Sequence, residues 1–429
     1  MSEQVNKRVL FLGSCLALIT TAFTFAIRAG ILPELGGQFG LSGEQLGFIN
    51  MMWFLGFPIS MVLGGIFYNS IGPKKIMQFA FIVHIVGIIM TIYAGGYTTL
   101  LISTLLIGLG NGCTEAACNP MIADAYKGNM VDKMLNRFHM WFPGGIVIGS
   151  LISKFMTDFA FGWEAQMWII VLPTIAYAFL FWGQKFPEPK LEEMKSLSEN
   201  VKALFSPVFL FLFACFALTA ISEFGPQQWV EIVMAQSGAS PMIILALVTG
   251  TMAVGRFFAG PVVEKLGQPG VLLSGSVLTA IGIYLFSTVT GPMAYVAALI
   301  FAMGICYFWP VMLGAGAKRA PKTGALGLSL LGGVGMFSTS IFQPIIGGWI
   351  DSSRAAYAEM GLTGSELELA AGQDTLASMT TFPLILIVLF TIFYIWQKKA
   401  DIKTVDEMVA EERLLQVMVM YKLLIYKIR

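Results

Sequence analysis

The chain has 429 residues, of which 56% are apolar and 12% are charged, and its formal net charge is +1. Soluble domains carry about 25% charged residues, and the mean hydropathy here is +0.76. The composition therefore excludes an ordinary soluble protein and indicates a polytopic membrane protein, and the nearly neutral charge gives no sign of a nucleic-acid partner.

Apolar runs of about 20 residues are long enough to cross a bilayer as α-helices. The sequence predicts twelve such runs, at Val9–Ile31, Leu46–Tyr68, Ile76–Tyr93, Leu100–Ala125, Phe138–Phe159, Gln166–Gly183, Pro207–Ile232, Pro241–Val263, Gly270–Thr288, Pro292–Ala315, Ala325–Ile350 and Ala377–Trp396. The first run exceeds the apolar core of a signal peptide and no clear cleavage site follows it, so we expect it to remain as a membrane helix.

A polar stretch rich in Glu and Lys divides these runs into two sets of six. We therefore predict an all-α polytopic membrane protein with an N-terminal six-helix half at 8–186, a linker at 187–206 and a C-terminal six-helix half at 207–398. A tail at 399–429 alternates apolar and basic residues, a pattern typical of a membrane-surface helix and equally of a solvated one.

The distribution of Lys and Arg predicts the orientation, because cytoplasmic loops of membrane proteins are enriched in both. With the N-terminus inside, most of the 26 basic residues fall on the cytoplasmic side. We expect both termini, the linker and the tail in the cytoplasm and the protein in a plasma membrane, such as a bacterial inner membrane. The acidic stretch Asp351–Leu376 is predicted to be an outer loop.

Three sequence features recur in the same order about 190 residues apart, which predicts that the two halves are pseudo-symmetric. The recurring pairs are the loops around Gly72 and Gly267, the prolines Pro120 and Pro310, and the glycine pairs that begin at Gly144 and Gly332. Parallel six-helix repeats place the substrate between the halves near the middle of the membrane.

The fourth run holds a carboxylate, Glu115, near the middle of its length. An ionisable group at membrane depth is costly and usually marks an ion or substrate pathway. Asn111, Glu115 and Asn119 are spaced by four residues and so lie along one face of a helix. We interpret this stripe as the lining of a cavity with Glu115 as a proton-coupling group; a Glu held by one permanent salt bridge is the alternative. Glycines at 108, 110 and 112 allow a neighbouring backbone to approach.

Arg28 in the first run is a candidate to pair with Glu115, to bind an anionic group, or to extend to the outer membrane surface. In the seventh run, Glu223, Gln227, Gln228 and Trp229 combine the amide, carboxylate and aromatic groups that a hydroxylated ligand needs. Glu223 is also a second candidate for proton coupling. A helix end that leaves the membrane is the alternative interpretation of this segment.

Three more residues are candidates for the binding site: His139, Trp141 and Trp309. A lone histidine is more often a packing residue than a proton relay, and this holds more strongly for His84. Aromatic residues are also common where helices meet lipid head groups, so Trp309 has the same two interpretations.

No motif for metal, nucleotide or covalent chemistry was found. The two histidines are too few and too scattered for a metal centre, and no Gly-rich phosphate loop or activated nucleophile is present. The five cysteines lie within apolar runs and are interpreted as packing residues: Cys15, Cys113, Cys118, Cys215 and Cys306. We therefore expect no enzyme activity, no metal and no cofactor.

Twelve spans, a central linker and the loop Gly65-x3-Asn69-Ser70-x-Gly72-Pro73-Lys74 together resemble the major facilitator superfamily. In that family the loop helps to gate the cytoplasmic side, where this chain has Asn69 and Ser70 in place of an acidic and a basic residue. The resemblance implies gating roles for Asn69, Gly72, Lys74, Glu264 and Lys265. Arg256, at the inner end of the eighth run, is expected to pair with this gate or with lipid head groups.

The segment Glu115-Ala116-Ala117-x-Asn119-Pro120 is similar to the span-four signature of the fucose:proton symporter branch. That branch carries sugars with protons, and its span-four Glu belongs to the cavity. The branch also has an acidic residue in span one, where this chain has Arg28.

We therefore expect a secondary transporter that imports a sugar or related polyol by proton symport and alternating access, as a monomer in the lipid bilayer. Na+ is the alternative coupling ion. Arg28 and Arg256 favour a second hypothesis, a carrier or exporter of organic anions, and a non-transporting membrane sensor is a third. No appended soluble domain is available to carry a signal, which counts against the sensor.

Overall fold

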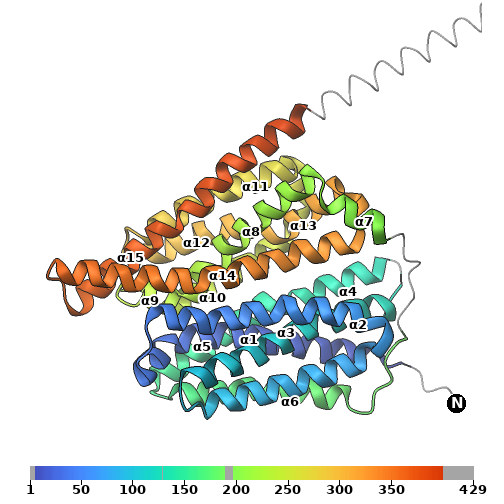
Figure 1. The fold of residues 1–429 in the computed structure, drawn as a ribbon, viewed down its shortest axis with the longest axis horizontal. Coiled ribbons are helices and arrows are strands. Elements are labelled where there is room, and N and C mark those ends of the chain that lie inside the picture. The colour runs from blue at the N-terminus through green and yellow to red at the C-terminus, as the bar shows by residue number, and fades with distance from the viewer. Residues whose placement is uncertain (1–4, 128, 189–196, 400–429) are drawn as a thin grey trace, which may run out of the picture.

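The computed structural model describes residues 5–127, 129–188 and 197–399, and the regular secondary structure within these ranges is helical. The N-terminal half comprises α1 (Lys7–Phe39), α2 (Gly43–Ile92), α3 (Tyr97–Ala125), α4 (Asn129–His139), α5 (Trp141–Asp158) and α6 (Trp163–Phe181). The C-terminal half comprises α7 (Leu197–Leu204), α8 (Pro207–Gln228), α9 (Val230–Val233), α10 (Pro241–Phe257), α11 (Ala259–Phe286), α12 (Met293–Ile305), α13 (Phe308–Arg319), a 3-10 turn (Pro321–Thr323), α14 (Gly324–Glu359), α15 (Gly364–Met379) and a last helix at 381–399. The two halves lie one above the other, with their long helices running in the same general direction (Figure 1).

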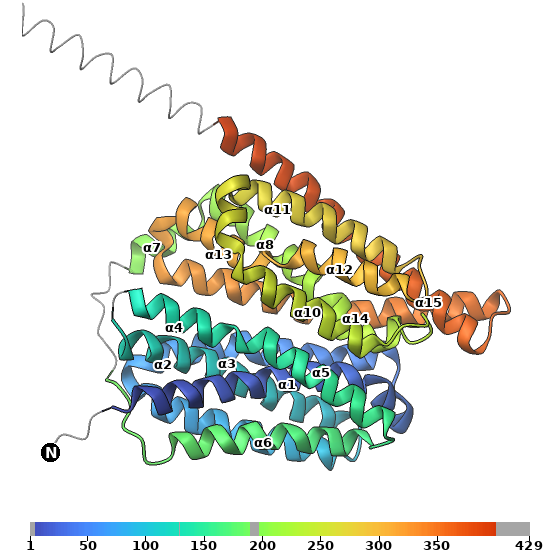
Figure 2. The same cartoon turned by 180° about the vertical axis from the view of Figure 1, so that it is seen from behind.

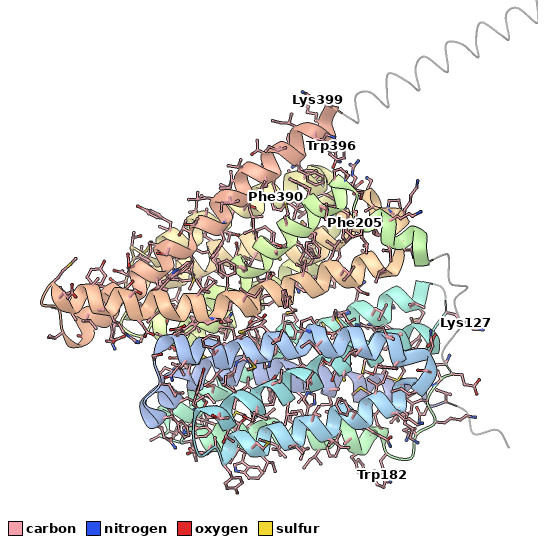
Figure 3. All side chains as sticks on the ribbon, in the orientation of Figure 1. Lys127, Trp182, Phe205, Phe390, Trp396 and Lys399 are labelled. Carbon is pink, nitrogen blue, oxygen red and sulfur yellow. The ribbon has the colours of Figure 1, made fainter. Side chains whose placement is uncertain are left out.

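The helices account for the twelve predicted spans. Within the described ranges, nine helices are long and apolar enough to cross a membrane. One of them, α2, contains two spans joined at Gly72, and α5 and α10 supply the remaining two. Large apolar side chains such as Trp182, Phe205 and Trp396 are exposed on the outside of the bundle (Figure 3), as a lipid-facing surface requires.

The predicted repeat appears in the backbone at Gly72 and Gly267. Gly72 has φ 78° and ψ 159°, and Gly267 has φ 66° and ψ 162°, so the two turns share one conformation. Residues with a side chain rarely adopt this conformation, which explains glycine at both sites. Each turn joins a pair of successive spans, and a proline follows each glycine closely, at Pro73 and Pro269.

Close packing between α2 and α3 depends on the predicted glycines. A Cβ on Gly112 would overlap the carbonyl oxygen of Phe57, and a Cβ on Gly108 would overlap that of Trp53. A Cβ on Gly110 would instead overlap the ring of His84. The glycines therefore let α3 approach its neighbours on two sides.

The stretch Asp351–Leu376 is mostly helical, so the prediction of a loop was wrong, whereas its outer location stays a prediction. The helix α14 continues through Asp351 to Glu359, and α15 begins at Gly364. This stretch is polar because it extends beyond the apolar layer, but polarity does not prevent helix formation. Pro120 does not interrupt α3, which continues to Ala125. Much of the predicted linker (189–196) and the tail from 400 onwards lie outside the described residues.

The two ends of the bundle differ in how the halves meet. We call the end with α7 and the chain's N-terminus the linker end, and the end with α9 and the turn from α14 to α15 the Asp351 end (Figures 1 and 2). At the Asp351 end, α2 and α14 pack backbone to backbone, because a Cβ on Gly43 or Gly347 would overlap the other helix. The Asp351 carboxylate accepts hydrogen bonds from the amides of Gly43 (2.8 Å) and Glu44 (2.9 Å), at the first turn of α2.

Candidate functional site

Arg28 lies buried at the junction of the two halves, with 6% of its surface exposed. Its Nη2 donates a hydrogen bond to Oε1 of Gln228 on the opposite half, and its guanidinium lies 4.8 Å from the ring centre of Trp53. Its Nε and Nη1 have no partner among the described residues, and none of the described carboxylates forms an ion pair with it. In this structure Arg28 neither pairs with Glu115 nor extends to the membrane surface.

The helix α8 ends in the same region and directs successive residues to different places. Gln228 bonds to Arg28 and also donates to the carbonyl oxygen of Phe25 at 3.3 Å. Trp229 is fully buried and donates from Nε1 to Oε1 of Gln343 on α14 at 2.9 Å. Gln228 therefore lies at the junction, whereas Trp229 bonds within its own half, and the binding roles of both residues stay a prediction.

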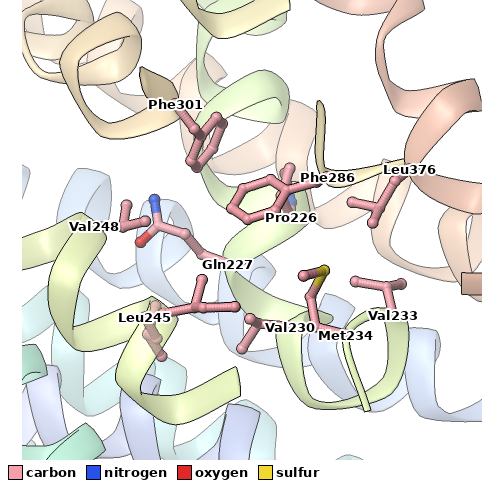
Figure 4. A pocket seen from close by; sticks show the side chains of 11 residues that line it. Pro226, Gln227, Val230, Val233, Met234, Leu245, Val248, Phe286, Phe301 and Leu376 are labelled. Carbon is pink, nitrogen blue, oxygen red and sulfur yellow. The ribbon is translucent and has the colours of Figure 1, made fainter. Parts of the chain in front are cut away.

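Gln227 has a different environment. Its side chain extends into a water-sized cavity of about 20 Å³ within the C-terminal half, among Val230, Leu245, Val248 and Phe301 (Figure 4). Its Nε2 donates to the backbone oxygen of Glu223 at 2.9 Å. The structure therefore places Gln227 away from the groups that surround Arg28.

Two buried amides on the helices that meet across the junction were not singled out from the sequence: Asn50 on α2 and Gln343 on α14. Neither polar atom of the Asn50 side chain has a partner in the described chain, and neither does Nε2 of Gln343. The sequence feature that could have identified them is a polar residue within an apolar run. Buried polar groups are normally hydrogen-bonded, so each exception calls for an explanation.

Three phenylalanines form a triangle across the junction, on the linker-end side of Arg28. The ring centres of Phe25, Phe54 and Phe224 are separated by 6.3, 5.9 and 5.9 Å. Phe25 precedes Arg28 by one turn of α1, and Phe54 follows Asn50 by one turn of α2, nearer the linker end. Trp309, a predicted binding residue, lies 6.2 Å from Phe224 and is partly exposed.

Glu115 is partly exposed and accepts a hydrogen bond from Nδ2 of Asn119 at 2.6 Å. Asn111, one turn away, is fully buried and does not contact Glu115. Its Nδ2 donates to Oγ1 of Thr24 at 3.2 Å, and its Oδ1 lies 3.0 Å from Nε2 of His84. The predicted stripe therefore splits into a partly exposed pair, Glu115 with Asn119, and a buried amide, Asn111, whose two polar atoms both have partners.

The Asn111 contacts belong to a polar network inside the N-terminal half. Because Oδ1 of Asn111 can only accept, Nε2 of His84 carries the proton, and Nδ1 accepts from the hydroxyl of Tyr177 at 3.0 Å. Trp53 Nε1 donates to the same Thr24 hydroxyl at 3.0 Å. The network thus extends to the ring on which the Arg28 guanidinium rests.

Glu223, the other candidate for proton coupling, is buried, with 3% of its side chain exposed. Its Oε1 lies 3.7 Å from Nη2 of Arg256, whose Nε donates to the carbonyl oxygen of Cys306 at 3.0 Å. Its Oε2 has no partner among the described residues. Arg256 thus meets an acidic residue of its own half rather than the loop at Glu264 and Lys265, which corrects the pairing we expected.

The remaining predicted residues lie toward the linker end. His139 is exposed and Trp141 is partly buried at the junction between α4 and α5. Asn69, Lys74, Glu264 and Lys265 are exposed around the two glycine turns at Gly72 and Gly267. Their positions are compatible with gating roles, which stay a prediction.

The sequence profile of the Major Facilitator Superfamily matches residues 14–328. The chain belongs to this superfamily. A protein of Bacillus subtilis assigned as a niacin/nicotinamide transporter is 22% identical over 373 residues, which cover 83% of this chain and 92% of that protein. The hexuronate transporter of the same organism is 24% identical over 314 residues, covering 65% and 74% of the two chains. The crystal structure of a D-xylose–proton symporter matches with a TM-score of 0.68 at 15% identity, covering 87% of this chain and 96% of that one.

These comparisons place the chain among integral membrane transporters of small molecules rather than among enzymes. The likeness to solved structures shows the major facilitator fold, in agreement with the twelve predicted spans. The relatives carry solutes of different chemical classes.

Proposed function

We propose that this chain is a proton-coupled importer of a sugar-class solute that carries a carboxylate. The observation that carries the proposal is Arg28, a buried cation that has two unpaired nitrogens and no anionic partner among the described residues. Buried charges in proteins are normally paired. A guanidinium also matches a carboxylate in geometry, through two parallel hydrogen bonds. A carboxylate on the solute would therefore complete this site.

The sugar-class part of the proposal is supported by the groups around Arg28. Gln228 supplies an amide, and Trp53 supplies an aromatic ring against the guanidinium. This combination of polar and aromatic groups suits a compact hydroxylated ligand. The span-four motif that resembles sugar:proton symporters, the hexuronate relative and the D-xylose–proton symporter structure point the same way.

Proton coupling is supported by Glu115 and Glu223. Both carboxylates lie in apolar spans, where burial disfavours the charged form and hydration favours it. Glu115 is partly exposed in the present state, as a group that exchanges protons with water must be. Rocking of the two halves would change this exposure and so link proton release to solute movement.

A carrier of organic anions without hydroxyl groups is the second candidate, because Arg28 alone could bind such a solute. Counterflow into proteoliposomes separates the two, with D-glucuronate, D-glucose and nicotinate as probes. We expect D-glucuronate to exchange at least about tenfold faster than D-glucose at equal concentration, since a charge-assisted pair contributes about 1.5–3 kcal/mol. Arg28→Gln should abolish this preference. Lys154→Gln, which removes the cation of an exposed pair with Asp158, is the control and should keep it.

Each other result changes the conclusion. Faster exchange of nicotinate than of D-glucuronate would favour the organic-anion carrier. Equal rates for D-glucose and D-glucuronate would remove the carboxylate from the proposal. No exchange of any probe would refute a sugar-class importer.

A further inference from the structure

We propose that Asn50 and Gln343 form an amide subsite beside Arg28 that recognises hydroxyl groups of the solute. The subsite would bind the uncharged part of a molecule whose carboxylate meets Arg28, so the inference rests on the proposed function. It assigns a chemical role to two residues that lie on opposite halves of the protein, one on α2 and one on α14.

The helix contacts bring α2 and α14 together beside these two residues. Gly47 on α2 packs directly on the backbone of Gln343 and Pro344. Asn50 follows Gly47 by three residues and precedes Trp53 by three, so the three residues share one side of α2. Trp53 faces Arg28. The Asn50 side chain therefore lies between the residues that meet α14 and the residues that meet Arg28.

The bonding state of these amides differs from that of Asn111. All three side chains are fully buried. Asn111 has partners for both of its polar atoms, whereas Asn50 has none in the described chain and Gln343 uses only its Oε1. An unpaired buried amide lowers stability, and an apolar residue of the same shape would avoid that loss. An unpaired asparagine at such a position points to a partner that binds reversibly.

A hydroxylated solute has the chemistry to be that partner. Each amide nitrogen carries two donors and the oxygen is an acceptor, while each hydroxyl can donate once and accept. Adjacent hydroxyls on a sugar ring can thus bond to both ends of one amide. A flat aromatic acid lacks these groups, so the subsite should separate sugar acids from other carboxylates.

Both ends of this region are closed in the present structure. The triangle of Phe25, Phe54 and Phe224 covers it toward the linker end, and the contact between Gly43 and Gly347 closes the Asp351 end. A solute can therefore reach the amides only when one of these contacts opens, as alternating access requires.

The test compares two buried asparagines of the same fold, Asn50→Leu and Asn111→Leu, in purified full-length protein. Without any solute, we expect the unfolding midpoint to stay the same or rise in Asn50→Leu and to fall in Asn111→Leu. In counterflow, Asn50→Leu should raise the half-saturation concentration for D-glucuronate about tenfold and change that for nicotinate less than twofold. Gln343→Met should show the same selectivity.

Two results would overturn the amide subsite. One is an unfolding midpoint that falls in Asn50→Leu as far as in Asn111→Leu, which would show that Asn50 is a structural residue. The other is an unchanged half-saturation for D-glucuronate in both Asn50→Leu and Gln343→Met. If the parent protein exchanges neither probe, the proposed function fails, and the solute-free comparison still decides whether Asn50 is held for a partner.

Discussion

Arg28 is stabilised by an aromatic face and one amide rather than by a carboxylate. A guanidinium above an aromatic ring gains about 0.5–2 kcal/mol, which is less than the several kcal/mol that burying an unpaired ion costs. Trp53 can hold this position because its indole bonds to Thr24, which bonds to Asn111. Asn111 is held in turn by His84. The neutral network therefore orients the surface on which the buried cation rests.

The coupling mechanism can be tested with a substitution of one residue, Glu115. Glu115→Gln keeps an oxygen that can accept the hydrogen bond from Asn119. The glutamine side chain, however, cannot release a proton. We expect gradient-driven accumulation to fall to about the equilibrium level while counterflow exchange is retained. Uptake driven by a proton gradient or a sodium gradient, compared in the same vesicles, also identifies the coupling ion.

Asp158→Asn is the matched control, because it removes a carboxylate from an exposed pair with Lys154 and should leave accumulation unchanged. If Glu115→Gln accumulates solute as the parent does, Glu115 is not the coupling group, and Glu223→Gln becomes the next variant to measure.

Some residues of the candidate site could be predicted from the sequence and others could not, for physical reasons. Arg28 and Glu223 stand out because a charge in an apolar run is costly. Gln227 and Gln228 are neighbours of the same type, and only the rotation of α8 about its axis decides which one reaches the junction. That rotation is set by packing against other helices, which a local pattern does not contain. Asn50 was recognisable as an amide in an apolar run but had no motif around it.

At the scale of elements, a hydropathy pattern does not identify helices that are rich in charged residues. The stretch Asp351–Leu376 is acidic, yet α14 and α15 occupy most of it, and Arg354 joins them through Glu368 at 2.6 Å. Hydropathy reports the depth of a residue in the membrane, whereas helix formation depends on backbone propensity and capping. The glycine turns were easier to predict. The backbone angles at Gly72 and Gly267 favour glycine, so the residue type itself marks each turn in the sequence.

Asp351 links elements of opposite halves, so it should influence which state the transporter adopts. Asp351→Asn removes the charge at the N-terminus of α2 and one of its two acceptors for backbone amides. The loss of a charge-assisted bond, about 1.5 kcal/mol, should shift the balance between closed and open states of this end by roughly tenfold. Spin labels at Gly37 and Ser352, on opposite halves, should report longer distances in the variant.

Asp374→Asn provides the control for this prediction. Asp374 lies at the same end of the bundle but accepts from Ser353 within one half. It should leave the distance distribution as in the parent. An unchanged distribution in Asp351→Asn would show that the glycine contacts alone hold this end closed.

At the scale of the whole molecule, the pseudo-symmetric repeat determines where the site lies. Each half folds around its own helices, and the candidate site forms where Arg28 of one half bonds to Gln228 of the other. The repeat and the twelve spans were predictable because they depend on hydropathy and on glycine turns within the sequence. The contacts across the junction join residues about 200 positions or more apart, and no local pattern specifies them.

The orientation of the molecule remains a prediction, and the structure offers good positions for testing it. Lys202 on α7 is exposed at the linker end, and Ser365 on α15 is exposed near the Asp351 end. The excess of Lys and Arg at the linker end predicts that this end faces the cytoplasm.

In a variant without the five native cysteines, we expect an impermeant maleimide added to intact cells to label Ser365→Cys and not Lys202→Cys. Lysis should make both sites reactive, which controls for buried or modified thiols. Labelling of Lys202→Cys alone in intact cells would reverse the orientation.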